Sequence, residues 1–241
     1  MNSFIVNPNA SSSRLTIDDN QFCLVIDDFL LEPELAAAHV HQHGKAFELQ
    51  SRGYPGSLFI PDGSTVKDIY QFFRSRLSRE FDFCRSGIKL ASVFSLLTLP
   101  PEELDWSQRM CHTDPRTEVG HNNLAGLIFL FEDPRLGGTG FYRLRNREVL
   151  QQASKIGATD MAGALAYLQA ELPMCREPPC YLADSSDVAE LIAAVTPRFN
   201  RAIFYSGDIP HSARIEAPEL LVDEVSKGRL TLNFFASVIP K

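Results

Sequence analysis

The sequence lacks the features that mark several classes of protein. No apolar run approaches the roughly 20 residues that a membrane-spanning helix needs, so we expect no membrane partner. The beginning of the chain is polar and does not show the charged and apolar regions of a secretory signal. The five cysteines are too few, and odd in number, for a disulfide framework. These absences predict a soluble, reduced, cytoplasmic protein.

Positive charge is also in short supply. The chain has 23 Lys and Arg against 30 Asp and Glu, which gives a net charge of −7 and disfavours a nucleic-acid partner. With 241 residues, of which 44% are hydrophobic, the chain can bury a substantial core. The length suits a single domain that spans residues 1–241.

The hydrophobic pattern changes along the chain. Residues 1–20 are rich in Asn and Ser and are predicted to be a flexible lead-in, followed by a strand over 22–26 and a helix over 33–43. Residues 64–83 repeat apolar side chains at three- and four-residue steps, which predicts an amphipathic helix. The remaining predicted strands cover 88–99, 110–113, 124–131, 139–144, 202–205, 212–216 and 230–238.

Residues 147–199 interrupt the series of strands. Helical patterns at 160–172 and 186–195 predict a helical insert, which is either a lid over a cavity or a dimerisation element. Because helices precede many short strands, the predicted fold class is α+β and mainly β. We expect a jelly roll in which the N-terminal helices buttress one sheet.

The candidate metal ligands form the most informative pattern. On a strand His112 and Asp114 would point to the same face, because residues two apart share a face. His211 lies on a later predicted strand segment and supplies a second imidazole. Two His and one carboxylate are the ligand set of non-haem Fe(II) oxygenases, in which three coordination positions stay open. A single His-X-Asp is common by chance, so the assignment depends on the rest of the chain.

Three further elements follow in order. Gly137 and Gly138 open a strand, an apolar strand at 202–205 leads to His211, and Arg229 opens the last strand. In that last strand Arg229, Thr231 and Asn233 alternate with apolar residues and therefore share one face. A polar face on an otherwise apolar strand is explained either by solvent or by a polar cavity.

This ordered series resembles the prolyl-hydroxylase-like branch of the 2-oxoglutarate/Fe(II)-dependent oxygenases, over roughly residues 88–238 outside the insert. The sequence looks closest to a bacterial subgroup of that branch, judged also by Tyr54-Pro55-Gly56. The resemblance implies a double-stranded β-helix of jelly-roll or cupin-like shape. It also implies a dioxygenase that uses Fe(II), 2-oxoglutarate and O₂ and hydroxylates a C–H bond.

The resemblance also implies roles for individual residues. His112, Asp114 and His211 would be catalytic residues that bind iron, and Arg229 with Thr231 would bind 2-oxoglutarate. A guanidinium suits a carboxylate because it can form two parallel hydrogen bonds. Tyr142 or Tyr205 would add a hydrogen bond to 2-oxoglutarate.

Several alternatives stay open at this stage. Arg214 competes with Arg229 for the carboxylate, although by alternation it would face away from His211. The double-glycine strand is one residue short of the common pattern, so Thr139 is given no role. The substrate class is an amino acid, a peptide or protein side chain, or a small metabolite. The alternative function is a non-catalytic, cupin-like accessory protein that binds a metal or small ligand, and a homodimer is compatible with either.

Overall fold

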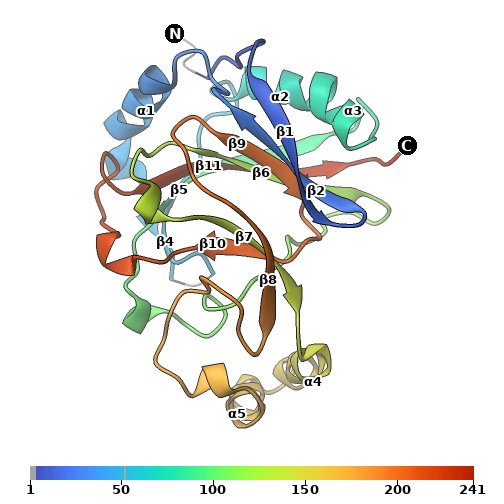
Figure 1. Ribbon diagram of the computed structural model, residues 1–241, viewed down its shortest axis with the longest axis vertical. Helices are drawn as coiled ribbons and strands as arrows, with labels where there is room; N and C mark the ends of the chain where they lie inside the picture. Colours follow the sequence, from blue (N-terminus) through green and yellow to red (C-terminus); the bar gives the residue numbers. More distant parts are fainter. Residues whose placement is uncertain (1–3, 52) are drawn as a thin grey trace.

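The computed structural model describes residues 4–51 and 53–241, and its main feature is two antiparallel sheets that face each other (Figure 1). The larger sheet has eight strands in the order β1-β2-β9-β6-β11-β5-β4-β3, and the smaller has the order β10-β7-β8. The larger sheet contains β1 (Ser11–Asp18), β2 (Gln21–Asp27), β3 (Glu48–Leu49), β4 (Gly56–Phe59), β5 (Lys89–Leu97), β6 (Asn122–Phe129), β9 (Ala202–Ser206) and β11 (Arg229–Val238). The smaller contains β7 (Gly138–Leu144), β8 (Ala189–Val195) and β10 (His211–Arg214).

The path of the chain between the sheets is that of a double-stranded β-helix. From β5 onward the chain moves from one sheet to the other several times. It ends in the larger sheet with β11, which lies between β5 and β6. The strand predicted at 110–113 is reduced to a single bridge between His112 and His211, so it joins the smaller sheet at one residue only. The predicted fold class, mainly β with a jelly-roll core, is confirmed.

Apolar side chains alternate along the strands and form two separate cores. Leu127 and Phe129 in β6 face Phe141 in β7 and Val195 in β8, and they fill part of the space between the sheets. The neighbouring residues in sequence point to the opposite face of the larger sheet, where the helices cover it. Apolar side chains therefore cover both faces of the larger sheet. A site between the sheets has to lie where polar side chains interrupt the apolar ones.

The N-terminal helices cover the outer face of the larger sheet, as predicted (Figure 1). They are α1 (Pro33–Gln42), α2 (Lys67–Phe72) and α3 (Ser78–Glu80), with a π-helical turn at Phe73–Leu77 between the last two. The π-helical turn lies within the predicted amphipathic helix, and Ile69, Phe73 and Leu77 are fully buried against the sheet.

Two sequence predictions are wrong about local structure. Residues 11–18, predicted as a flexible lead-in, form β1, which pairs with β2 at the edge of the larger sheet. Most of its side chains are exposed and polar, so no apolar alternation marked it. Residues 189–195, predicted as helix, form β8; their alanines favour a helix, but pairing with β7 decides the conformation.

The true helical part of the insert lies between β7 and β8. The helices α4 (Arg147–Gly157) and α5 (Met161–Glu171) pack beneath the smaller sheet, far from the larger one (Figure 1). Their buried side chains join a third core with Cys111, Tyr142 and Leu182. No residue of 147–199 lines the hollows of about 910, 370 and 120 Å³ that the described residues form around β5 and β11. The lid and dimerisation roles of this insert stay predictions.

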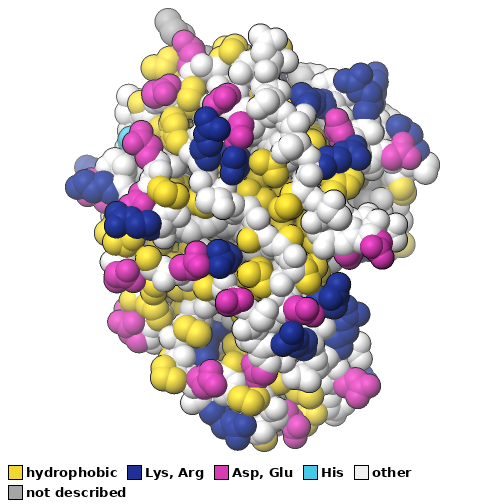
Figure 2. All heavy atoms as spheres, in the orientation of Figure 1, with side chains coloured by type: hydrophobic (Ala, Val, Ile, Leu, Met, Phe, Trp, Pro, Cys, Tyr) yellow, Lys and Arg dark blue, Asp and Glu magenta, His cyan; other side chains and the backbone are white. Residues whose placement is uncertain are grey.

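The surface carries charges of both signs. Figure 2 shows basic and acidic side chains interspersed over one face, with apolar side chains between them and no field of a single sign. Within residues 4–51 and 53–241, every helix is too short or too polar to cross a bilayer.

The ring of Phe204 should be among the largest single contributions to stability. Phe204 is fully buried, and its ring centroid lies 5.6 Å from that of Phe73 and 5.8 Å from that of Phe29. We expect Phe204→Ala to lower the free energy of unfolding by about 3–5 kcal/mol, measured by denaturant titration. Phe235→Ala is the matched control because its side chain is 42% exposed; equal losses in both variants would contradict the proposed core.

Candidate metal centre

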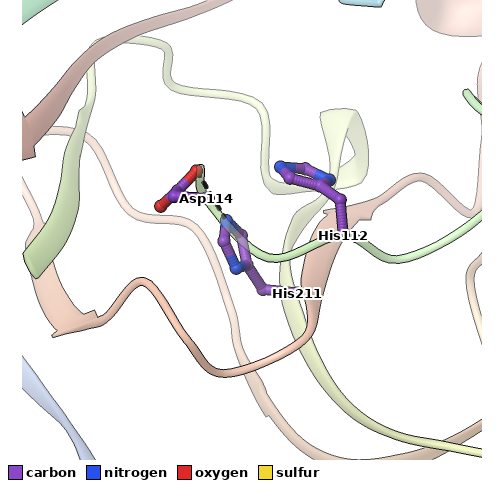
Figure 3. A group of neighbouring side chains, drawn as sticks. All are labelled: His112, Asp114 and His211. Carbon is purple, nitrogen blue, oxygen red and sulfur yellow. Dashed lines mark ion pairs between the residues drawn. The ribbon is translucent and has the colours of Figure 1, made fainter. Parts of the chain in front are cut away.

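The backbone brings the three predicted metal ligands together. His112 and His211 exchange two backbone hydrogen bonds, with N–H to carbonyl distances of 3.0 and 2.9 Å. Asp114, two residues further on, donates its N–H to the carbonyl of Gly207 at 2.8 Å. The segment that carries His112 and Asp114 is thus tied to the start of β10 and to the turn before it (Figure 3).

The turn before β10 is shaped to admit the Asp114 carboxylate. A Cβ atom at Gly207 would lie 2.9 Å from Oδ2 of Asp114, so a larger residue there would force this carboxylate to move. Asn123 donates its side-chain amide to the Asp114 carbonyl at 3.1 Å. Arg116 forms two hydrogen bonds to the Asp208 carboxylate, at 3.1 and 2.6 Å, and so joins the same two segments on the outside.

The side chains of the triad have the spacing of a metal site. One donor atom each from His112, Asp114 and His211 lies within 4.8 Å of the other two, and Nε2 of His211 is 4.0 Å from Oδ1 of Asp114. Nδ1 of His211 is 2.8 Å from the carbonyl of Ile209, so this nitrogen carries the proton and Nε2 presents its lone pair to the site. Figure 3 shows the three side chains around a common space.

A buried acceptor in the triad has no partner. Oδ2 of Asp114 is buried and forms no hydrogen bond with any described residue. Leaving a buried carboxylate oxygen unpaired is costly, and a bound cation would remove that cost. His112 is exposed to solvent, whereas Asp114 and His211 are buried, so the site is open on one side. The donor set and the spacing both fit a divalent transition metal.

Burial sets the protonation states that a metal requires. Desolvation lowers the pKa of His211 to about 4, although its bond to Ile209 acts in the opposite direction. Desolvation and the neighbouring His211 lower the pKa of His112. Desolvation raises the pKa of the Asp114 carboxyl, against the effect of His112. Near neutral pH both imidazoles are therefore neutral and able to bind a metal.

Two residues of the triad line a small cavity between the sheets. The cavity has a volume of about 120 Å³, and His112 and His211 line it at one end. Arg229 and Thr231 from β11, and Ser95 from β5, line it as well. The predicted polar face of β11 thus points into a cavity and not to solvent.

Arg229 is a buried cation without an anionic partner. It is 3% exposed, and no described residue forms an ion pair with it. Burial lowers the pKa of its guanidinium, while the hydroxyls of Tyr54, Tyr181 and Tyr205 raise it. A guanidinium stays protonated in such surroundings, so its charge calls for an anion in the cavity.

The double glycine of the sequence holds Arg229 in place. Nε of Arg229 donates to the carbonyl of Gly137 at 3.0 Å, and an Nη atom donates to the carbonyl of Gly138 at 2.9 Å. Gly137 has a φ of +86°, and a Cβ at Gly138 would lie 1.9 Å from the carbonyl oxygen of Val195. Neither position accepts a larger residue, so both glycines are needed to turn their carbonyls toward Arg229.

Sequence reasoning gave no role to two residues that line the cavity. The hydroxyls of Tyr54 and Thr139 are buried, line the cavity and have no hydrogen-bond partner among the described residues. Thr231 lies 2.8 Å from Ser95, hydroxyl to hydroxyl, beside them. Tyr54 belongs to a turn before β4, and no local pattern connects that turn with Arg229. For Thr139, strand alternation with Phe141 was the available signal, because Phe141 also faces inward.

The other predicted residues fall on different sides of the sheet. Tyr205 lines the cavity, and its ring centroid is 4.8 Å from that of His211. Tyr142 points to the opposite face of β7, where its hydroxyl donates to the carbonyl of Leu182 at 2.7 Å, so its predicted contact with 2-oxoglutarate is not supported. Arg214 donates to the carbonyl of Ala183 and pairs with Glu216, and it does not line the cavity.

A family model matches residues 8–236, nearly the whole chain. The family is described as a family of unknown function, DUF6445. The chain belongs to this family. No curated protein sequence matches that of this DUF6445 member.

Solved structures similar to this DUF6445 protein are distant in sequence. HygX from Streptomyces hygroscopicus, with nickel and 2-oxoglutarate bound, is 13% identical, with 92% of this chain and 84% of HygX covered and a TM-score of 0.42. A Pseudomonas putida prolyl-4-hydroxylase is 12% identical, with 87% and 85% covered and a TM-score of 0.42. EvdO2 from Micromonospora carbonacea var. aurantiaca, complexed with 2-oxoglutarate, is 12% identical, with 94% of each chain covered and a TM-score of 0.40. Similarities of this size assign neither a cofactor nor a substrate to the chain.

Removal of either imidazole should abolish metal binding. We expect His112→Ala and His211→Ala to lose most of their bound Ni²⁺ or Fe²⁺, because two remaining ligands cannot hold the ion tightly. Metal content after dialysis, measured by mass spectrometry, tests this. His41→Ala, on the exposed surface of α1, is the matched control; full metal content in both triad variants would exclude the site.

Metal affinity should depend on pH in a defined direction. A metal binds the unprotonated ligands, so the raised pKa of Asp114 makes proton competition begin at this carboxylate as the pH falls. His211, with a pKa of about 4, is protonated only at lower pH. We expect the Ni²⁺ affinity measured by calorimetry to be constant above about pH 7 and to fall below about pH 6. An affinity that stays constant down to about pH 4 would contradict the proposed ligands.

Proposed function

We propose that this protein is a 2-oxoglutarate-dependent, non-haem Fe(II) oxygenase that hydroxylates its substrate. One observation carries the proposal: the two histidines of the His-Asp-His triad and a buried guanidinium without an ion-pair partner among the described residues line the same small cavity. One end of the cavity, at His112 and His211, suits a divalent cation, and Arg229 at the other end suits an anion. A short dicarboxylic acid that also coordinates the metal satisfies both ends.

The size of the cavity supports a small co-substrate. At about 120 Å³ it is smaller than the ~300–1,000 Å³ of pockets for drug-sized ligands, so it admits a small acid and little else. In the proposal the distal carboxylate of 2-oxoglutarate pairs with Arg229. The hydroxyls of Tyr54 and Thr139, which have no partner among the described residues, donate to the same carboxylate.

Tyr205 lies between the two ends of the cavity. The pKa of its hydroxyl is raised well above the ordinary value by burial first and by the Asp114 carboxylate second, while Arg229 acts in the opposite direction. A phenol that interacts with both groups is placed to donate a hydrogen bond along the length of the co-substrate. It stays protonated there and serves to orient the ligand.

The residues around the site divide the work of such a reaction. Bound Fe(II) would supply the activation of O₂ and of the co-substrate, which no side chain of the chain can supply. His112, Asp114 and His211 hold the ion on one side and leave its other positions free. Ala125, Leu127 and Phe234 line the cavity with apolar atoms and limit the entry of water.

Succinate formation tests the proposed function. The purified protein with Fe(II), ascorbate and 2-oxoglutarate should form succinate slowly without substrate and should lose this activity in His211→Ala. Binding of metal and 2-oxoglutarate without any succinate would favour the alternative, a non-catalytic accessory protein of the same fold.

Arg229 should dominate the affinity for 2-oxoglutarate. We expect Arg229→Ala to weaken binding by about 2–4 kcal/mol, because a buried charge pair loses one partner. Calorimetric titration of the Ni²⁺-loaded protein with 2-oxoglutarate measures this, and thermal unfolding checks that the variant folds.

Arg214→Ala is the matched control for Arg229→Ala. Arg214 is the last residue of β10, but its guanidinium pairs with Glu216 and does not line the cavity. Unchanged affinity is expected in this variant. A loss in Arg214→Ala that equals the loss in Arg229→Ala would show that the assignment of the carboxylate site is wrong.

A further inference from the structure

The cavity of the metal centre leaves no room for the molecule that is to be oxidised. Two larger hollows adjoin it. One of about 370 Å³ is lined by Asp114, Lys89 and Glu118, and a groove of about 910 Å³ lies between β5 and residues 58–70. Phe235 lines both hollows and the metal cavity. A substrate in the groove would therefore approach the metal past Phe235.

Phe235 is an unusual residue for the inner face of a sheet. In register it lies between Ala91 of β5 and Ala125 of β6, and these small neighbours leave its ring 42% exposed. On the same face of β11, Asn233, Thr231 and Arg229 follow toward the other end of the cavity. One strand thus connects the groove with the proposed co-substrate site.

The wall of the groove is a strand edge without a neighbour. β5 pairs with β11 along its whole length, from the pair of Lys89 and Ser237 to the pair of Leu97 and Arg229. On its other side β5 pairs with β4 only from Phe94 to Leu97, because β4 ends at Phe59. Residues 89–93 therefore have no strand on that side within the described chain, and residues 90–93 line the groove.

Strand alternation shows which backbone groups face the groove. The N–H of Phe129 donates to Arg201 and that of Gly207 donates to Asn123, so the odd-numbered residues of β6 bond toward β9 and its even-numbered residues bond toward β11. The carbonyl of Leu230 accepts from Leu130 on the β6 side, which leaves the odd-numbered residues of β11 to bond the odd-numbered residues of β5. The N–H and C=O of Leu90 and Ser92 consequently point into the groove.

We propose that the substrate of this protein is an extended peptide segment, which adds to the free edge of β5 at Leu90 and Ser92 as a further strand. This inference rests on the proposed function. Two donors and two acceptors in strand spacing match the backbone of a peptide, and a small metabolite has no such repeating pattern. The side chain that is oxidised reaches the metal past Phe235.

The charge of the groove favours a peptide with a basic residue. Glu48 lines the groove, is exposed and forms no ion pair with a described residue. Lys89 lines the neighbouring hollow of about 370 Å³ and is already paired with Glu118. A Lys or Arg in the bound segment would pair with Glu48 without disturbing that second pair.

Hydrogen exchange at single amides tests the proposal on the unaltered protein. The probe is a library of capped hexapeptides, random at each position, added to protein that is loaded with Ni²⁺ and 2-oxoglutarate so that no turnover occurs. We expect exchange of the Leu90 and Ser92 amides to slow by about tenfold. The amides of Ala91 and Val93 are bonded to β11 already, so they serve as internal controls that do not change.

Two comparisons isolate the backbone contact. The same library with every backbone amide N-methylated should give no protection, because it cannot complete the strand. Ser92→Pro removes the groove-facing N–H and keeps the pairing with β11, and proline is accepted at strand edges of this kind. This variant should bind 2-oxoglutarate as the unaltered protein does and should lose protection at Leu90, whereas Ser92→Ala should retain it.

The outcomes separate this inference from the proposed function. Unchanged exchange at Leu90 and Ser92, in protein that binds 2-oxoglutarate, overturns the peptide substrate and leaves the proposed function intact. Protection that is equal with the N-methylated library also overturns it. Protection at both amides in a protein that fails to bind 2-oxoglutarate supports the peptide site and refutes the proposed function. If Ser92→Pro does not fold, the comparison of the two libraries decides.

Discussion

The buried charge of Arg229 is the constraint on which the account of this protein depends. A guanidinium that is 3% exposed and has no carboxylate partner in the described chain is stable only if something else compensates it. The carbonyls of Gly137 and Gly138 supply part of that compensation and fix its orientation. An anion would supply the remainder, and the cavity that would hold it is also lined by His112 and His211 of the triad.

The other end of the cavity is organised by backbone contacts. His112 and His211 form a single bridge with two backbone hydrogen bonds where a strand of the smaller sheet was predicted. Two residues later, Asp114 bonds to the turn before β10. Gly207 leaves the space for that carboxylate, and Ile209 selects the nitrogen that His211 turns toward the other two residues of the triad. The residues that make the site possible are therefore largely those with small side chains or with backbone roles.

Sequence reasoning found the groups with distinctive chemistry and missed those that depend on packing. His112, Asp114 and His211 could be predicted because few residue types bind metals and their order along the chain was informative. The role expected for Arg229 came from the resemblance to the oxygenases, and the alternation of polar and apolar residues in its strand supported it. Tyr54 could not be found, because it precedes the short strand β4 and no local pattern of the sequence connects that turn with the cavity. The sequence could not choose between Tyr142 and Tyr205, because aromatic character does not reveal which face of a strand a residue occupies; the structure places Tyr205 and not Tyr142 at the cavity.

Anomalous diffraction from crystals soaked anaerobically with Fe(II) and 2-oxoglutarate tests the central claim most directly. The account predicts a single iron peak at bonding distance from His112, Asp114 and His211, with the distal carboxylate of 2-oxoglutarate against Arg229. An iron peak at another group of residues, or a carboxylate held away from Arg229, would contradict it.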